Sequence, residues 1–514
     1  MSRAGVAALS LLALAAGPAA AHQADQFATS PRTLGLAGAG SALGDGGASA
    51  FSAPAALGLA ERDEFRLYWI GGAVNLAEVE GVERIDADGN VIPREDLPPE
   101  MRLPEQAIAP HSLTVDLVKR LGPWAAAGAY VTFPMPFLFF HDSRDPWAPS
   151  SVRYRNRVAQ STGVVGASVR LPVRGLPGVG GVTRDSALQG GLFFGFSISI
   201  LPKANIEIDL DLIGVDDGTS EPFIDVGLRD VDLVVRARWR PAFSLLLEGA
   251  TLHPALAGSR LGVTWRLPVQ ADIDPIHLDV AVEGLGNLSP IFALVDRIQA
   301  EVWLGLVDFY EPHQVKVSLA HQAERFAVSL DLQWSDWSAL VPSYGRVVEG
   351  PDGTGGSLIL DLRGENDFSY TVVGRRTIDT DAVKDTLDVA FGGEVYLPSL
   401  PTWPGQEPLR ATVRAGYRWQ PSMLNPTDGP SALLDGGVHT AAVGFGVQGP
   451  SLPIFDGPLS VDWGLQVQRI LGMALPKTDD GLAGLEGMPV VYSDGARWPG
   501  GWAVVTGLQI GTRF

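Results

Sequence analysis

Few residues in this chain have the types and spacing that enzymatic or metal chemistry requires. Gly444–Gly449 reads GFGVQG and matches the dinucleotide-binding fingerprint by letter, but Pro450 follows it and no helix is predicted there. Asp86–Asn90 begins like a calcium loop, yet Val91 and Leu97 occupy the positions that need glycine and a bidentate glutamate. The histidines are scattered, and neither Gly-x-Ser-x-Gly nor His-Glu-x-x-His occurs. We therefore predict no catalytic residue, no metal site, no cofactor and no enzymatic activity.

A second group of residues with chemical potential is the arginines at even spacing. Arg410, Arg414 and Arg418 alternate with the apolar residues Leu409, Val413 and Tyr417. This pattern predicts a β-strand with one apolar face and one cationic face. Because buried charges need partners, we expect the inward arginines mainly to balance inward carboxylates such as Asp331 and Asp462. The alternative is that one arginine binds the carboxylate of a ligand.

Composition narrows the class of protein. The chain has no cysteine, which removes thiol catalysis and disulfides, and its net charge of −20 argues against nucleic acid as a partner. Residues 1–21 combine Arg3, an apolar run and a small-residue cleavage site, so we predict a secretory signal peptide cut after Ala21. No later segment has eighteen uninterrupted apolar residues, so a membrane location would require a closed barrel.

From Asp63 onward the dominant hydrophobic period is two. Sixteen runs read as strands, many about ten residues long, which is the length of a tilted membrane-spanning strand. Several end in tryptophan or tyrosine, as at a membrane interface. Short turns alternate with long connections, and residues 63–514 are predicted to form one transmembrane antiparallel β-barrel. The predicted runs are 63–75, 111–120, 123–133, 161–172, 188–201, 226–240, 243–252, 259–267, 275–284, 312–321, 326–335, 386–397, 408–419, 437–448, 458–469 and 502–514.

Two of the long connections carry apolar patterns. Residues 133–140 read FPMPFLFF, an apolar cluster that suits contact with lipid, another loop or a ligand. Leu288–Tyr310 has Ile291, Leu294, Val295, Ile298 and Val302 at helical spacing. We expect an amphipathic helix over one barrel mouth, more often a packing element than a ligand site.

The segment before the first strand has an unusual composition. Of the 27 residues from Leu34 to Ala60, 16 are glycine or alanine, with large apolar residues recurring among them. Such a segment cannot build a core of its own, and polar linkers have a different composition. We therefore predict that residues 22–62 form a plug inside the barrel. Its predicted key positions are Gly35, Gly38, Gly40, Asp45, Ala53, Pro54 and Ala55.

The order of these features resembles the FadL/TodX family of outer-membrane transporters for long-chain fatty acids and other hydrophobic compounds. The Gly/Ala-rich run closes on Ala53-Pro54-Ala55, where the family plug ends in Asn-Pro-Ala, so Ala53 replaces an asparagine. The late strands and the terminal aromatic residue are also similar. The stretches concerned are Trp334–Ser338, Asp385–Gly393, Leu409–Tyr417, His439–Gly444 and Phe514.

The resemblance implies a barrel of fourteen strands in the outer membrane of a Gram-negative bacterium. It implies passive uptake of a hydrophobic small molecule through an apolar lumen, with displacement of the plug and lateral exit. Expected partners are that ligand, outer-membrane lipid and lipopolysaccharide, and the barrel-assembly machinery through Phe514. A polar-solute porin and a non-transporting structural or adhesive barrel are the alternatives. Candidate ligand-binding residues are Phe133, Phe137, Phe139, Phe140, Arg414 and Arg418.

Overall fold

The structure is a computed structural model of the chain. It describes residues 23–85, 91–92, 106–135, 150–151, 153–154, 162–171, 191–215, 223–283, 295–339, 357–362, 368–370, 383–401, 408–425, 433–451, 457–475 and 491–514. The predicted signal peptide lies outside the described residues. No described helix is long and apolar enough to cross a membrane.

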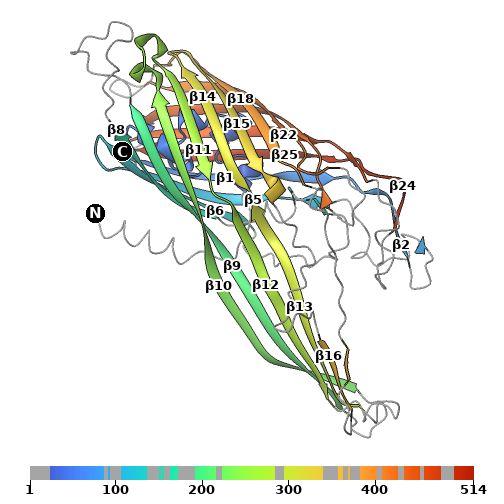
Figure 1. Ribbon diagram of the computed structural model, residues 1–514. Helices are drawn as coiled ribbons and strands as arrows, with labels where there is room; N and C mark the ends of the chain where they lie inside the picture. Colours follow the sequence, from blue (N-terminus) through green and yellow to red (C-terminus); the bar gives the residue numbers. More distant parts are fainter. Residues whose placement is uncertain are drawn as a thin grey trace.

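Fourteen strands in the described part of the chain close into an antiparallel barrel (Figure 1). Each pairs with the next along the ring, and the last strand pairs with the first over 13 residue pairs, from Glu64↔Arg513 to Leu76↔Gly501. The ring therefore has no free sheet edge. In order, its strands are β1 (Glu64–Leu76), β5 (His111–Arg120), β6 (Ala125–Met135), β8 (Thr162–Leu171), β9 (Leu192–Val215), β10 (Phe223–Glu248), β11 (Ser259–Arg266), β14 (His313–Gln322), β15 (Phe326–Asp336), β18 (Thr386–Tyr396), β19 (Arg410–Gln420), β21 (Val438–Ser451), β22 (Pro458–Ile470) and β25 (Gly501–Arg513).

The barrel has fewer strands than the hydrophobic pattern alone predicted. The runs 226–240 and 243–252 are one strand, β10, and the run 275–284 belongs to β12 (Val269–Glu283), which lies outside the ring. Pro241 lies between the first two runs. It lies just before the pairing of β10 with β11 begins at Ala242, at the edge of that ladder, where a strand tolerates proline.

Several strands extend far beyond the barrel. β9 and β10 have 24 and 26 residues, and they run with β12 and β13 (Val295–Glu311) into the lower part of Figure 1. β12 pairs in parallel with β9, and β13 pairs with β16 (Ser357–Leu362), which pairs with β17 (Phe368–Tyr370).

The prediction of an amphipathic helix over Leu288–Tyr310 is wrong for the part of this segment that the structure describes. Residues 295–311 form β13. From Ile298 to Leu306 the apolar residues also alternate at period two, and pairing with β12 on one side and β16 on the other satisfies the backbone. The apolar residues of this stretch fit both the helical period and the strand period of two. Pairing with the neighbouring strands stabilises the strand.

Smaller elements lie at the barrel ends. Most short connections, such as residues 121–124 between β5 and β6, lie at what we call the turn end, and most long ones leave from the opposite loop end. At the loop end, β4 (Gln106–Ile108) continues the pairing with β1, and a small separate sheet forms. That sheet contains β2 (Glu80–Ile85), β3 (Val91–Ile92), β23 (Met473–Ala474) and β24 (Val491–Trp498). Short elements elsewhere are β7 (Ser150–Ser151), which pairs with β20 (Leu433–Leu434), and the 3-10 turns η7 (Gly249–Thr251), η8 (Pro254–Leu256) and η10 (Trp337–Ala339).

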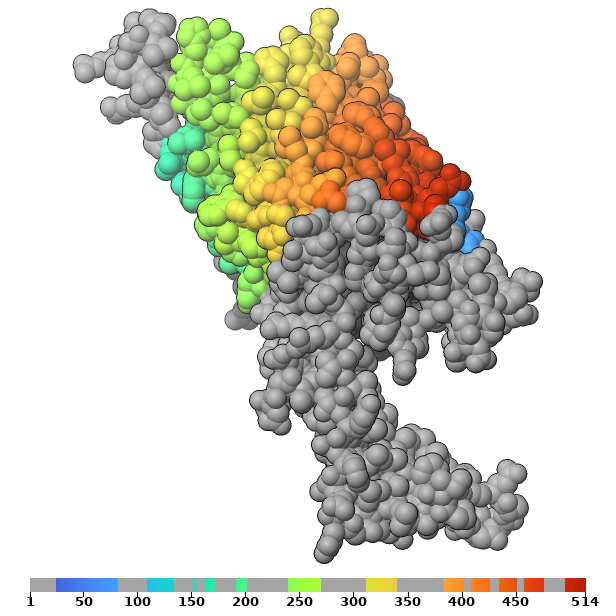
Figure 2. All heavy atoms as spheres, turned by 45° about the vertical axis from the view of Figure 1, so that its right-hand side comes forward, coloured from blue at the N-terminus to red at the C-terminus, as the bar shows by residue number. Residues whose placement is uncertain are grey.

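Side chains alternate between the outer surface and the interior of the barrel. On β19, Val413 and Tyr417 are 45% and 47% exposed on the outside, whereas Arg414 is 7% exposed and faces inward. Arg418 also faces inward, while Arg410, the first residue of the strand, is exposed. Figure 2 shows one outer face of this wall, in which the ring strands from β11 through β14, β15, β18, β19 and β21 to β22 lie side by side.

The N-terminal segment fills the barrel interior. It consists of short helical turns joined by irregular backbone, and nearly all of its residues up to Leu57 are buried. Its elements are α2 (Gln23–Gln26), α3 (Pro31–Leu34), η1 (Ser41–Leu43), η2 (Gly46–Ala48), α4 (Ser49–Ser52) and η3 (Pro54–Leu59). The packing of this segment, which we call the plug, inside the barrel confirms the predicted fold.

Candidate functional site

The plug folds locally because its glycines adopt conformations that other residues avoid. Gly40, with φ of 106°, precedes η1 in the left-handed region, and Gly44, with φ of 77°, ends it. Ser30 caps α3, where its side chain and that of Thr33 form a capping box with the backbone. Pro54 begins η3.

The barrel wall meets the plug with a row of inward glycines, which we call the glycine row. A Cβ on Gly416 would lie 2.2 Å from the backbone of Leu36, and one on Gly464 would lie 2.3 Å from the carbonyl oxygen of Pro31. Because these distances are shorter than van der Waals contact, only glycine lets the two backbones approach this closely. The glycine row on successive strands comprises Gly392, Gly416, Gly444, Gly464 and Gly507.

The opposite wall makes similar close contacts with the end of the plug. A Cβ on Gly195 would lie 2.0 Å from the nitrogen of Ala55. The Ala55 N–H donates to Ser244 Oγ at 2.5 Å, and its carbonyl accepts from Ser168 Oγ at 2.9 Å. Ala53 and Pro54 are buried beside it. The Ala-Pro-Ala segment is therefore positioned by wall residues on β8, β9 and β10.

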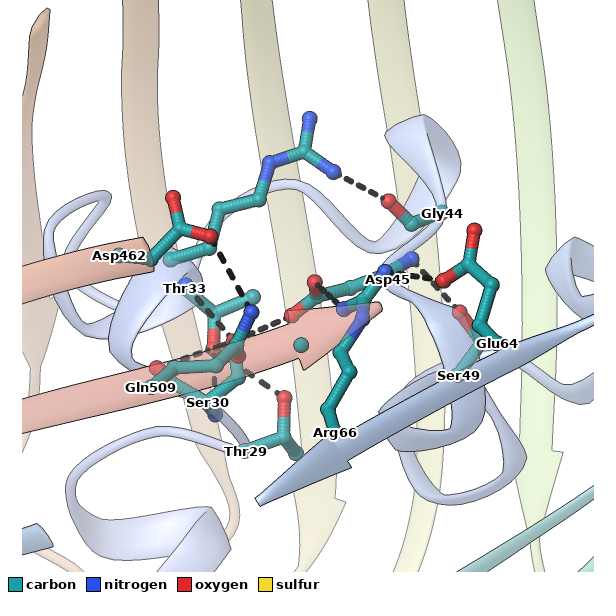
Figure 3. Close-up of polar contacts among 12 residues, drawn as sticks. Thr29, Ser30, Thr33, Gly44, Asp45, Ser49, Glu64, Arg66, Asp462 and Gln509 are labelled. Carbon is teal, nitrogen blue, oxygen red and sulfur yellow. Dashed lines mark hydrogen bonds and ion pairs between the residues drawn. The ribbon is translucent and has the colours of Figure 1, made fainter. Parts of the chain in front are cut away.

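Asp45 forms one ionic anchor of the plug (Figure 3). Its carboxylate accepts from Arg66 Nη1 at 2.7 Å and from the hydroxyl of Ser30, and its own N–H donates to Ser49 Oγ at 2.8 Å. Arg66, on β1, also pairs with Glu64. Asp45 thus joins two parts of the plug to the first barrel strand.

Arg32 forms the second anchor. It donates two hydrogen bonds of 2.8 Å to Glu394 on β18 and one of 2.6 Å to the carbonyl oxygen of Gly44. Burial alone would lower the pKa of Arg32, but its attraction to and hydrogen bonds with Glu394 raise the pKa above its ordinary value. Glu394 also binds Arg414, which pairs with Asp462 at 2.6 Å. Arg32 of the plug therefore joins a network of ion pairs that Glu394, Arg414 and Asp462 form on the barrel wall.

Two small cavities with shared lining residues lie beside the plug in the described part of the chain, each of about 40 Å³, which is space for a few water molecules. Asp25, Gln333, Asp388 and Arg418 line both. Their other charged lining residues are Arg153, Arg266, Glu311, Lys316 and Asp331. The sequence suggested an apolar lumen; these cavities are instead strongly polar.

An apolar cluster runs along another side of the plug. Phe51 of the plug lies 6.0 Å from Tyr130 between ring centroids, and Phe27 lies 6.5 Å from Tyr154. The cluster continues from Leu34 and Leu57 inside the barrel to residues near the loop end. Those residues are Leu76, Leu434, Val438, Ile470, Leu475 and Trp498. The interior therefore offers both a polar and an apolar side.

The predicted ligand-binding residues occupy different environments. Arg418 lines both cavities, whereas Arg414 is held between Glu394 and Asp462 and lines neither. Phe133 is half-buried on β6. Phe137, Phe139 and Phe140 lie outside the described residues. Of the predicted plug positions, Gly38 lies beside Arg418, because a Cβ on Gly38 would lie 3.6 Å from Arg418 Nη1.

Sequence reasoning missed the wall partners of the plug. Arg66 and Glu394 have the alternating position of any inward residue, and their pairing with Asp45 and Arg32 joins residues 21 and 362 apart. The glycine row was detectable as glycine at inward positions of five strands, a signal that is weak in each strand alone. Among the described residues, no group of three or more His, Asp or Glu side chains is placed to hold a metal ion.

Comparison with known proteins gives structural likenesses only. No protein-family model matches the sequence, and no curated protein matches it. A Pseudomonas aeruginosa FadL homologue is 16% identical with a TM-score of 0.48, covering 94% of this chain and 98% of that chain. The Ralstonia pickettii toluene transporter TbuX is 15% identical with a TM-score of 0.42, covering 95% and 99%. The Pseudomonas putida toluene transporter TodX is 12% identical with a TM-score of 0.40, covering 95% and 99%.

Proposed function

We propose that this chain is a plugged outer-membrane channel through which hydrophobic small molecules pass without an energy source. The observation that carries the proposal is the plug. It fills a closed barrel and is held by the ion pairs of Asp45 and Arg32, which can separate without breaking any barrel ladder. A purely structural or adhesive barrel would have no need for a removable filling.

The outer surface supports a membrane location. Exposed apolar side chains cover the outward positions of the barrel strands, and outward tryptophans lie near the loop end. Trp265, Trp334 and Trp502 are 43%, 37% and 43% exposed. In this arrangement the strands face lipid, and the loop-end aromatic residues lie at the outer leaflet with its lipopolysaccharide. The exposed terminal Phe514, whose N–H donates to the carbonyl of Asp63 at 3.0 Å, would be the signal for barrel assembly.

Two features support the proposal that the solute is apolar. The family that the sequence resembles carries fatty acids and other hydrophobic compounds, and the apolar cluster runs from the loop end to the plug. Burial of apolar solute surface there contributes roughly 25 cal/mol per Å². The two cavities among the described residues are too small for such a solute, so in this proposal the plug moves during transport, and lateral exit into the membrane is part of the proposal.

A polar-solute porin is the second candidate, favoured by the charged lining of the two cavities. Proteoliposomes that contain the full chain distinguish the two. The proposed channel speeds the entry of toluene or dodecane into vesicles whose outer leaflet is lipopolysaccharide, a layer that slows hydrocarbon entry, and leaves arabinose swelling at the level of protein-free vesicles. Rapid swelling in arabinose without hydrocarbon uptake would establish the porin. Native mass spectrometry of the copurified ligand would then identify the solute.

A further inference from the structure

A row of large outward residues crosses four neighbouring strands of the ring near the loop end. Trp419 of β19 pairs with His439 of β21, which in turn pairs with Arg469 of β22. On its other side Arg469 pairs with Trp502 of β25. Directly opposed residues of antiparallel strands share one face of the sheet, with Cβ atoms about 5 Å apart. The outer surface therefore places an arginine between a histidine and a tryptophan.

Arg469 is a cation without a carboxylate partner among the described residues. It is exposed, and its guanidinium makes one hydrogen bond there, from Nη1 to the carbonyl oxygen of Gly501 at 3.2 Å. By contrast, the exposed loop-end arginine Arg497 is paired with Glu80 at 2.5 Å. Because the chain has a net charge of −20, an exposed arginine that no described carboxylate neutralises is suited to an anion from outside the chain.

His439 supplies a second donor beside this cation. Its Nδ1 lies 2.7 Å from the hydroxyl of Tyr417, and its ring packs on Trp419 with centroids 4.3 Å apart. A tyrosine hydroxyl that donates to Nδ1 leaves the proton of the neutral ring on Nε2. Nε2 has no hydrogen-bond partner in the described part of the chain. The histidine is therefore held by its neighbours and keeps one N–H group for a ligand.

Arg469 lies at the end of an apolar stretch of the outer surface. On β22, the outward residues Val461, Trp463 and Val467 are 36%, 40% and 46% exposed, and Arg469 follows them toward the loop end. In the proposed orientation these apolar residues face acyl chains, and tryptophans mark the interface between acyl chains and headgroups. The cation is therefore at the level of the headgroups of the outer leaflet, where the phosphates belong to lipopolysaccharide.

We propose that Arg469 and His439, flanked by Trp419 and Trp502, form a binding site for a phosphate group of lipid A, the lipid anchor of lipopolysaccharide. This inference rests on the proposed outer-membrane location with the loop end outward. A guanidinium binds phosphate through parallel hydrogen bonds, and Nε and Nη2 of Arg469 are available for them. The tryptophans pack against the apolar part of the same lipid, so the site fixes the height of the barrel in the outer leaflet.

The test measures binding of bisphosphorylated lipid A to the purified full-length protein by native mass spectrometry. Arg469→Gln is expected to weaken binding about tenfold, because charge-assisted hydrogen bonds are lost. His439→Phe keeps a ring on Trp419 but removes the nitrogen donor, and it is expected to weaken binding about threefold. Arg325→Gln, at an exposed position of the turn-end connection between β14 and β15, is the matched control and should bind as wild type.

The same titration with dephosphorylated lipid A separates phosphate recognition from general lipid binding. Wild type should bind it about tenfold more weakly than the phosphorylated form, and Arg469→Gln should remove most of this preference. An equal loss in Arg325→Gln, or equally tight binding of phosphatidylglycerol, would overturn the assignment to lipid A. Hydrocarbon entry into vesicles is measured in parallel. Its failure with an intact lipid A preference would overturn the channel function alone, whereas normal entry without that preference would overturn only the lipid A site.

Discussion

Arg32 of the plug and Glu394 of β18 are joined by two parallel hydrogen bonds of 2.8 Å, one from Nε and one from Nη2. The Glu394 side chain is 1% exposed and also accepts from Arg414 Nε at 2.7 Å. Bidentate arginine–carboxylate pairs are among the stronger hydrogen-bonded contacts in proteins. The buried Glu394 carboxylate therefore binds both Arg32 of the plug and Arg414 of the barrel wall. The free energy of plug release depends on this carboxylate.

Replacing Arg32 by glutamine should loosen the plug without unfolding the barrel. The change breaks a largely buried pair, for which about 3 kcal/mol is expected because Arg414 still compensates Glu394. In planar bilayers, the variant should show brief ion-conducting openings more often than wild type. Arg62→Gln, at the exposed C-terminal end of the plug, is the control and should behave as wild type. Identical opening frequencies in Arg32→Gln and wild type would contradict the anchoring role.

Deletion of residues 34–60 should convert the closed barrel into an open pore. The ring is closed by β1 and β25 without help from the plug, so the deleted protein should still fold. Its single-channel conductance should rise severalfold because the segment that fills the lumen is gone. The heat-dependent gel mobility of the folded barrel is the control for folding. Unchanged conductance in a folded variant would show that the plug is not the barrier.

The strand pattern predicted most of the barrel because alternation is a local property. On β19, Val413 and Arg414 face opposite sides as their order indicates. The same local pattern gave a wrong prediction at residues 298–306, where the apolar residues fit both a helix and a strand. Pairing with β12 and β16 makes this stretch a strand. The local pattern also divided β10 at Pro241, since sequence alone does not show which side of a strand lacks a hydrogen-bond partner.

The plug was predictable as a segment, but its contacts were not. Its small residues and position before β1 indicated enclosure, and Asp45 was singled out within it. The partner of Asp45, Arg66, and the partner of Arg32, Glu394, come from strands brought close only by closure of the barrel. Their charges resemble those of any inward residue, so no local pattern distinguishes an anchor from lumen charge balance.

Replacing Gly416 by valine should exclude the plug while leaving the barrel intact. A Cβ there would lie 2.2 Å from the Leu36 backbone, and valine is otherwise a favourable strand residue. We expect a folded barrel whose plug is cleaved by added protease and whose ion conductance is raised. Gly163→Val is the matched control, because a Cβ at Gly163 meets nothing within 4 Å. A protease-resistant plug in Gly416→Val would show that the close contact is dispensable.

Asp116→Asn should stabilise the folded protein rather than weaken it. Asp116 is fully buried on β5, and its only nearby donor among the described residues is the backbone N–H of Gly47, which does not form a hydrogen bond of ordinary geometry with either carboxyl oxygen. The charges near it are Arg66, Asp45 and Glu64, so one cation faces two other carboxylates. Removing the third negative charge is expected to gain about 1 kcal/mol, since an unpaired buried charge costs more than an unpaired amide.

The measurement for Asp116→Asn is the temperature at which the barrel loses its folded gel mobility, which should rise. Asp331→Asn is the matched control. Asp331 is a buried wall carboxylate that accepts from the N–H of Ser41 at 3.2 Å and from Ser329 Oγ at 3.3 Å. Its replacement should lower that temperature. A fall for Asp116→Asn as well would show that the carboxylate at 116 stabilises Arg66 instead of opposing Asp45 and Glu64.

Single cysteines along β19 should report the orientation of the barrel in lipid. The chain has no native cysteine, so each introduced thiol is unique. Cysteines at Val413 and Tyr417 should react with lipophilic maleimides in vesicles, and cysteines at Arg414 and Arg418 should not, because those side chains face the interior. A one-residue register slip would move the arginines into lipid at about 2–4 kcal/mol each near the midplane. Preferential lipophilic labelling at 414 and 418 would therefore contradict both the register of β19 and the membrane-facing surface proposed for the barrel.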